Sequence, residues 1–187
     1  SSCSGDTPET TAILVVRELL DNADWIRWAS LNDLLPLLAE AAPDEYLNLV
    51  DKAVQMDPCP FNTVFAQESS GFTGRTYMTG LLWSLETLAW KPDYLTHVIN
   101  ILGSLASIDP GGNWTNRPEN SLSTILLPWM PQTCASIAIR KSAISALLQE
   151  FPKVAWKLLL KLLPSSHEVS SGSHKPSWRN YIPENWS

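Results

Sequence analysis

The chain has 187 residues, of which 44% are hydrophobic and 17% are charged. This composition is typical of a folded globular domain and excludes a disordered chain. The length suffices for one domain with its own core. Since no apolar run approaches the roughly 18–20 residues of a membrane-spanning helix, we expect no membrane contact.

The charge is distributed unevenly along the chain. Residues 1–137 carry 6 basic and 16 acidic side chains, a net charge of −10, whereas residues 138–187 carry 7 basic and 3 acidic ones, a net charge of +4. Because contacts to phosphates supply most of the affinity for nucleic acids, the acidic part argues against general nucleic-acid binding. The basic end leaves local phosphate binding open.

The cysteines indicate the cellular location of the chain, and its first residues indicate whether it has been processed. Cys3, Cys59 and Cys134 are odd in number and lack CxxC spacing, which argues against a disulfide framework and a zinc site. We therefore expect a reducing, cytoplasmic location, with no metal and no cofactor. The chain opens on "SSCSGDTPETT", without a secretory signal or an initiator Met, so we expect a processed product or a piece of a longer protein.

Apolar residues recur at helical spacing along most of the chain, and no segment alternates like a strand. Thr7 and Pro8 are suited to begin a first helix, and Pro43 another. We interpret 57–74 as a long connection holding one turn of helix. The other helices are predicted near 25–31, from 32, and at 76–90, 93–108, 122–129, 133–151 and 153–163.

Prolines mark an internal repeat. Each of three Leu-rich helices ends at a proline, and a second amphipathic helix with an early aromatic follows. Proline favours such a corner because it suits a first turn and disfavours helix before it. Hairpins of this kind bury their apolar faces by stacking. The sequence therefore predicts an all-α fold, an irregular α-solenoid of HEAT- or TPR-like helical hairpins. The prolines and aromatics are Pro43 with Tyr46, Pro92 with Tyr94, and Pro152 with Trp156.

We expect two parts, a helical-repeat domain over residues 1–164 and an extended tail over residues 165–187. The tail lacks helical periodicity. Trp178, Tyr181 and Trp186 are its candidate anchors on the domain. Elsewhere, Trp83 and Trp90 lie seven residues apart on one helix face, so we predict that both pack in the core.

The segment "DPGGNWTNRPENS" (109–121) is the richest polar loop. Its Pro-Gly-Gly turn ends a helix, and Asn120 or Ser121 is suited to cap the next one. We interpret the loop first as a bridge between helices and second as a binding surface. Its candidate binding residues are Asn113, Trp114, Asn116 and Arg117.

No catalytic signature is present: GxxxxGK[ST], GxGxxG, GxSxG and HExxH are all missing. Glu86 lies on or near the apolar face of its helix, where an ionised carboxylate needs a partner. Arg75 and Arg117 are the candidates. A structural ion pair is the favoured interpretation, and a small enzyme site around these three residues is the alternative.

Lys153, Lys157 and Lys161 form an i, i+4, i+8 stripe. Such a stripe is typical of the solvent side of an amphipathic helix. The alternative is a binding patch for an acidic partner, phosphate or nucleic acid.

The stretch "GLLWSLETLAWKPDYLTHVINILGSLASIDPGGNWTNRPENSLSTILLPWMPQT" (80–133) resembles the C-terminal helical regions of very large bacterial proteins that are similar to STAND-type NTPases. The wording that carries the resemblance is "LAWKPDYL", "DPGGNWTNRPENSL" and "PWMPQT". Several such proteins act in antiviral defence, with the nucleotide-binding motor and effector N-terminal and the helical repeats sensing a ligand or partner. The resemblance implies no binding residues.

Together these observations predict a non-catalytic interaction or sensor module. Its partner would be another protein or the NTPase core of its own parent chain.

Overall fold

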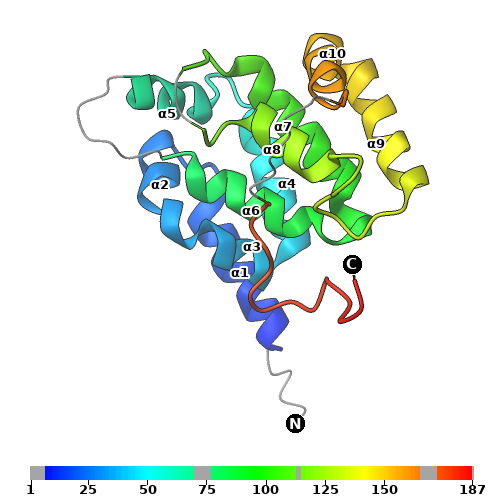
Figure 1. Cartoon of the computed structure of the whole chain (residues 1–187). Coiled ribbons are helices and arrows are strands. Elements are labelled where there is room, and N and C mark those ends of the chain that lie inside the picture. The colour runs from blue at the N-terminus through cyan, green and yellow to red at the C-terminus, as the bar shows by residue number, and fades with distance from the viewer. Residues whose placement is uncertain (1–6, 70–76, 113–114, 165–171, 187) are drawn as a thin grey trace.

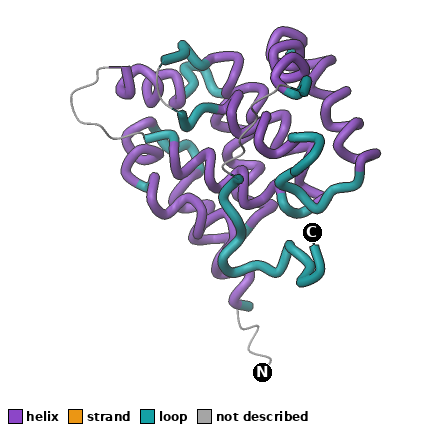
Figure 2. The backbone as a smooth tube through the Cα atoms, in the orientation of Figure 1, coloured by secondary structure: helices purple, strands orange, loops and turns teal. Residues whose placement is uncertain are grey.

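The computed structural model describes residues 7–69, 77–112, 115–164 and 172–186, and over these residues the chain is all-helical, with no strand (Figures 1 and 2). The all-α prediction is confirmed. In chain order the α-helices are α1 (Pro8–Leu20), α2 (Trp25–Ser30), α3 (Leu35–Ala41), α4 (Pro43–Val54), α5 (Pro60–Ser69), α6 (Thr79–Ala89), α7 (Leu95–Ile108), α8 (Pro118–Leu126), α9 (Ile137–Glu150) and α10 (Pro152–Lys161). Two 3₁₀ turns, η1 (Asn32–Leu34) and η2 (Pro92–Tyr94), precede α3 and α7.

Most helix starts follow local chemistry. The side chains of Thr7, Asp24 and Ser136 accept a backbone N–H in the first turn of α1, α2 and α9. Pro43 and Pro152 begin α4 and α10, and Pro92 begins η2. The predicted proline corners are therefore confirmed as the starts of helical segments.

Helix α9 begins at Ile137, four residues after the predicted start at 133, and two other segments differ more from expectation. The predicted connection at 57–74 contains a full helix, α5, because Phe61, Val64 and Phe65 are buried against the core and packing stabilises a helix that local sequence does not. Helix α8 begins at Pro118, before the predicted start at 122. Asn120 is thus inside the helix, and its side chain donates to the Thr115 carbonyl (2.7 Å) instead of capping.

Helices α6 and α7 form the centre of the molecule. Helix α6 packs on α3, α7 and α8, while α7 also packs on α4 and α9. Apart from the partly buried Ile108, their leucines and isoleucines are buried, among them Leu85, Leu88 and Ile99. At this centre the Tyr46 and Ser84 hydroxyls are hydrogen-bonded (2.5 Å). The core thus joins the N-terminal helices to the pair α9 and α10 at the opposite edge (Figure 1).

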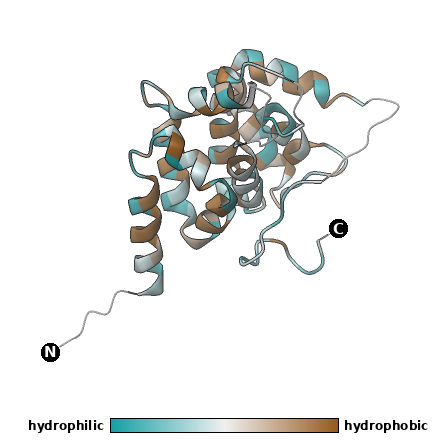
Figure 3. Cartoon of the chain, turned by 90° about the vertical axis from the view of Figure 1, so that its left-hand side faces the viewer, coloured by the Kyte–Doolittle hydropathy of each residue, from teal (hydrophilic) through white to brown (hydrophobic). Residues whose placement is uncertain are grey.

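Some apolar surface stays uncovered. Helix α1 projects from the body towards the N-terminus and exposes Ile13, Leu14 and Val15 (Figure 3). Across the described residues, every helix is too short or too polar to cross a bilayer.

Candidate functional site

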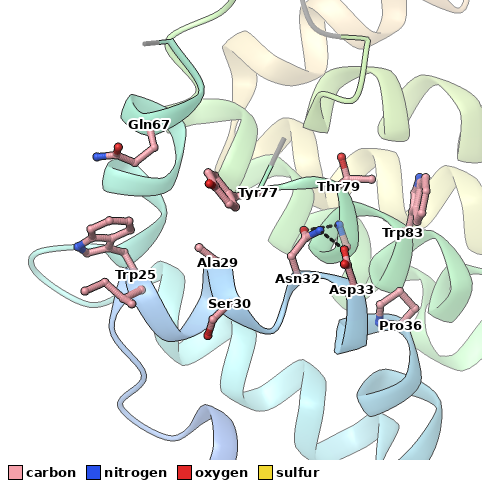
Figure 4. A pocket seen from close by; sticks show the side chains of 12 residues that line it. Trp25, Ala29, Ser30, Asn32, Asp33, Pro36, Gln67, Tyr77, Thr79 and Trp83 are labelled. Atoms are coloured by element: carbon pink, nitrogen blue, oxygen red, sulfur yellow. Dashed lines mark hydrogen bonds between the residues drawn. The ribbon is translucent and has the colours of Figure 1, made fainter. Parts of the chain in front are cut away.

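An open groove of about 760 Å³ lies between α2, η1 and the first turns of α6 (Figure 4). Trp25, Tyr77 and Trp83 contribute aromatic side chains to its walls. Asp33 and Asn32 contribute polar groups from η1. We call this feature the aromatic groove. Its mix of large apolar rings and a few polar groups is typical of a ligand-binding surface.

The groove is built on a close contact between η1 and α6. The side-chain oxygen of Asn32 accepts the Gly80 N–H (2.8 Å), and so satisfies a donor in the first turn of α6 that has no partner within the helix. The Asn32 amide donates in turn to Asp33 (2.9 Å). A side chain at Gly80 would meet the Asn32 carbonyl at 1.6 Å. Only glycine lets the two elements approach this closely.

Trp83 joins the groove to the C-terminal tail. Its side chain is 41% exposed, so the prediction that it packs in the core is wrong, whereas Trp90 is fully buried as predicted. The His174 ring stacks on Trp83, with ring centroids 5.0 Å apart and planes 4° from parallel. The ring therefore lies between the groove and the bound tail.

Residues 172–186 of the tail run in an extended path across α6 and α3 (Figure 1). Glu86 accepts the His174 N–H (2.8 Å) with one carboxylate oxygen and the Ser121 hydroxyl (2.7 Å) with the other. The Trp90 indole N–H donates to the His174 carbonyl (3.1 Å). Both main-chain groups of His174 are thus bound by the body.

Glu40 binds the tail a few residues later. Its carboxylate is nearly buried and accepts three successive backbone N–H groups, from Ser177 (2.9 Å), Trp178 (2.7 Å) and Arg179 (2.9 Å). The Arg179 guanidinium donates to the carbonyls of Glu40 (2.7 Å) and Ala41 (3.2 Å) at the end of α3. These carbonyls have no partner within the helix, so the tail completes the helix end.

Of the three candidate tail anchors, two act through their side chains. Tyr181 packs edge-on against Tyr94, and burial raises the pKa of Tyr181 to about 12. Trp186 packs edge-on against Trp90 (4.8 Å between centroids). Trp178 is held through its backbone N–H, and the residue is 77% exposed.

The polar loop 109–121 is tied to the body. Asn113 and Trp114 lie outside the described residues. The Asn116 amide donates to the Thr79 hydroxyl (3.1 Å) at the rim of the aromatic groove. Arg117 forms an ion pair with Asp109 within its own loop. These contacts agree with the interpretation of the loop as a bridge, and they place Asn116 next to the groove.

Glu86 and Arg117, considered as partners, do not meet, since Glu86 bonds Ser121 and the tail while Arg117 pairs with Asp109. Arg75 lies outside the described residues.

The lysine stripe of α10 faces α8 on one side. Lys157 (3.0 Å) and Lys161 (3.6 Å) both form ion pairs with Glu119 in the first turn of α8. Lys153 is exposed on the same helix. Two of the three lysines thus link neighbouring helices, as expected for the polar side of an amphipathic helix. Within the described ranges no group of three or more His, Cys, Asp or Glu side chains is placed to hold a metal ion.

Sequence reasoning missed Glu40 and Asp33, and misjudged Trp83. Glu40 carried a signal, because it is a lone carboxylate within the apolar run "LLAEAA". Asp33 carried none, since an exposed aspartate beside an asparagine is typical of any helix start.

Comparisons of the chain with protein-family models, with curated proteins and with solved structures find no match. The fold and site alone therefore define its class: an all-helical chain with an open aromatic groove beside a self-bound, extended C-terminal segment.

Proposed function

We propose that this chain is a non-catalytic interaction module that binds an extended segment of a protein partner in the aromatic groove. The observation that carries the proposal is the position of the groove. It is open, and it meets at Trp83 the surface on which the body already holds an extended polypeptide, its own tail.

The chemistry of the bound tail supports a polypeptide ligand. Glu40 and Glu86 bind main-chain N–H groups, which every residue except proline offers. The groove adds aromatic surface in Trp25, Tyr77 and Trp83. Tryptophan and tyrosine are enriched among the residues that dominate binding energy at protein interfaces.

The wider role proposed for the module rests on sequence. The hairpins α3–α4 and α9–α10, each turning at a proline, support an irregular α-solenoid of HEAT- or TPR-like repeats. The resemblance of residues 80–133 supports a sensor region of a cytoplasmic STAND-type NTPase of bacterial antiviral defence. In that role the groove would bind a foreign protein or the NTPase core of the parent chain.

Selection from a displayed-peptide library on the immobilised full chain tests the proposal. Two variants alter the groove. Trp25→Ala removes an aromatic side chain from its wall, and Ile26→Asp places a charge on its exposed rim. Trp156→Ala is the matched control, because Trp156 is equally a tryptophan but lies exposed on α10, outside the groove.

We expect peptides selected on the wild type to bind Trp156→Ala equally and both groove variants at least about tenfold more weakly, a loss of about 1.4 kcal/mol. Thermal unfolding checks that the variants stay folded. Equal binding to all four proteins, or no enrichment at all, would contradict the proposal.

A further inference from the structure

We infer that the aromatic groove selects a basic side chain, Arg or Lys, within the partner segment, and that Asp33 is its ion-pair partner. The inference rests on the proposed function and narrows it from a polypeptide to one of stated charge.

Asp33 is the charged side chain among the described groove-lining residues. Its carboxylate is exposed, and one oxygen is held by the Asn32 amide (2.9 Å). Among the described residues no lysine or arginine lies within ion-pair distance of it. Within the part of the chain that the structure describes, the carboxylate is thus oriented by a neighbour and carries no ion pair.

The aromatic rings that share the groove with Asp33 favour the same ligand. Trp25, Tyr77 and Trp83 line the groove with it, and Figure 4 shows Trp83 towards the Asp33 end and Trp25 at the other. The faces of such rings attract ammonium and guanidinium groups. A groove that holds a carboxylate and aromatic rings binds a cation better than an anion, because an anion would meet negative charge from the carboxylate and from the ring faces.

The net charge of the body also favours a basic segment, at distances longer than direct contacts. Residues 1–137, which supply every described lining residue, carry a net charge of −10. A field of this sign speeds the encounter with a basic segment and opposes an acidic one.

The segment that the body already holds contributes basic side chains to the contact. Residues 172–186 contain Lys175 and Arg179 and a single acidic residue, Glu184, which is exposed. The Lys175 ammonium lies over the Trp90 ring, 5.6 Å from its centroid, and the Arg179 guanidinium binds carbonyls at the end of α3. The surface next to the groove thus uses one of the contacts that we infer within it, a cation over an aromatic ring.

The test is a titration of the isotope-labelled full chain, followed by the indole N–H NMR signals of Trp25 and Trp83. The probes are acetyl-Leu-Arg-Leu-Leu-amide and the same peptide with citrulline, which keeps the shape of arginine without its charge. The protein variants are Asp33→Asn and, as the matched control, Asp93→Asn, an equally neutralised aspartate outside the groove with an exposed side chain.

We expect the arginine peptide to shift both indole signals and to bind at least about tenfold more tightly than the citrulline peptide. Asp33→Asn should remove that difference, and Asp93→Asn should keep it. Added salt should weaken only the arginine peptide, since screening acts on charge.

Equal binding of the two peptides, or an arginine preference that survives Asp33→Asn, would overturn the inference. Failure of the basic preference can be distinguished from failure of the proposed interaction module. If library peptides bind in the groove but lack basic residues, the interaction module stands and the basic preference falls. If no peptide of either kind binds, both fall.

Discussion

Glu40 is the residue on which tail docking depends most. A nearly buried carboxylate is stable only when its lone pairs are satisfied, and three tail N–H groups satisfy those of Glu40. Hydrogen bonds to a charged group each contribute about 1.5–3 kcal/mol. Glu40 therefore couples the tail to α3 across more than a hundred residues of sequence.

Glu40→Gln should lower the free energy of unfolding by about 2 kcal/mol. The amide has one acceptor oxygen, and its NH₂ group would face the N–H groups of the tail. Hydrogen exchange at Ser177, Trp178 and Arg179 should speed up as the tail detaches. Glu184→Gln, an exposed carboxylate in the same tail, is the control and should change neither quantity. Unchanged exchange in Glu40→Gln would refute the coupling.

Tyr181 gives the tail a dependence on alkaline pH. Burial raises its pKa from 10.0 to about 12, so the folded state favours the neutral phenol. This stabilisation is complete below pH 10 and is lost as the pH rises through about 12. Between these values the wild type should lose more stability than Tyr181→Phe, measured by denaturant unfolding. Parallel losses in both proteins would show that Tyr181 makes no such contribution.

The residues of the site were the least predictable from sequence. Trp83 and Trp90 occupy equivalent positions seven residues apart, and only the tail and the groove, far apart in sequence, leave one ring exposed and bury the other. The burial of Glu40 likewise depends on residues 177–179. Helical periodicity reports which face of a helix is apolar, not which later segment returns to cover it.

At the level of elements, the contact of η1 with α6 sets the shape of the groove. An added methyl at Gly80 would lie 1.6 Å from the Asn32 carbonyl, which is backbone and cannot move aside alone. At Gly103, where α7 meets α9, the methyl would instead meet the side chains of Leu147 and Phe151. The two glycines should differ in the cost of an added methyl, because side chains can rearrange at lower cost than backbone.

Gly80→Ala should therefore destabilise the protein by about 2 kcal/mol or more, despite the gain of about 1 kcal/mol in helix propensity. Gly103→Ala should cost less. Chemical denaturation measures both, and NMR of the Trp83 indole reports whether the groove changes shape. A more stable Gly80→Ala protein would contradict the described contact.

The ion pairs between α10 and α8 should be weak, because Lys157 is mostly exposed. Lys157→Ala should lower the free energy of unfolding by no more than about 1 kcal/mol. Lys153→Ala, on the same helix without a described ion pair, should have almost no effect. A larger loss for Lys153 would indicate a role for the stripe that its geometry does not show.

The elements themselves were largely predictable. Proline corners and Ser, Thr and Asp caps act within one turn, so the starts of α1, α2 and α4 follow from local sequence. Helix α5 and the early start of α8 did not follow. Burial of Phe61 and Phe65 stabilises α5, and Pro118, a favoured first-turn residue, begins α8 ahead of its apolar positions.

The whole molecule is a helical body, acidic over residues 1–137, that holds its own extended tail beside an open aromatic groove. Composition and periodicity predicted the all-α class. They could not predict the groove, because it arises where α2, η1 and α6 meet and each contributes only a few side chains. The surface proposed to bind a partner thus belongs to the tertiary structure.

A photocrosslinking amino acid placed at Ile26 on the groove rim tests directly whether the groove binds a protein segment, in cells with and without phage infection. The same amino acid at Leu148, exposed on α9, is the control. We expect that, of the two positions, Ile26 alone crosslinks to one defined segment of another protein or of the parent chain, and that a basic residue lies at the crosslinked site. Identical products from both positions, or none from Ile26, would contradict this expectation.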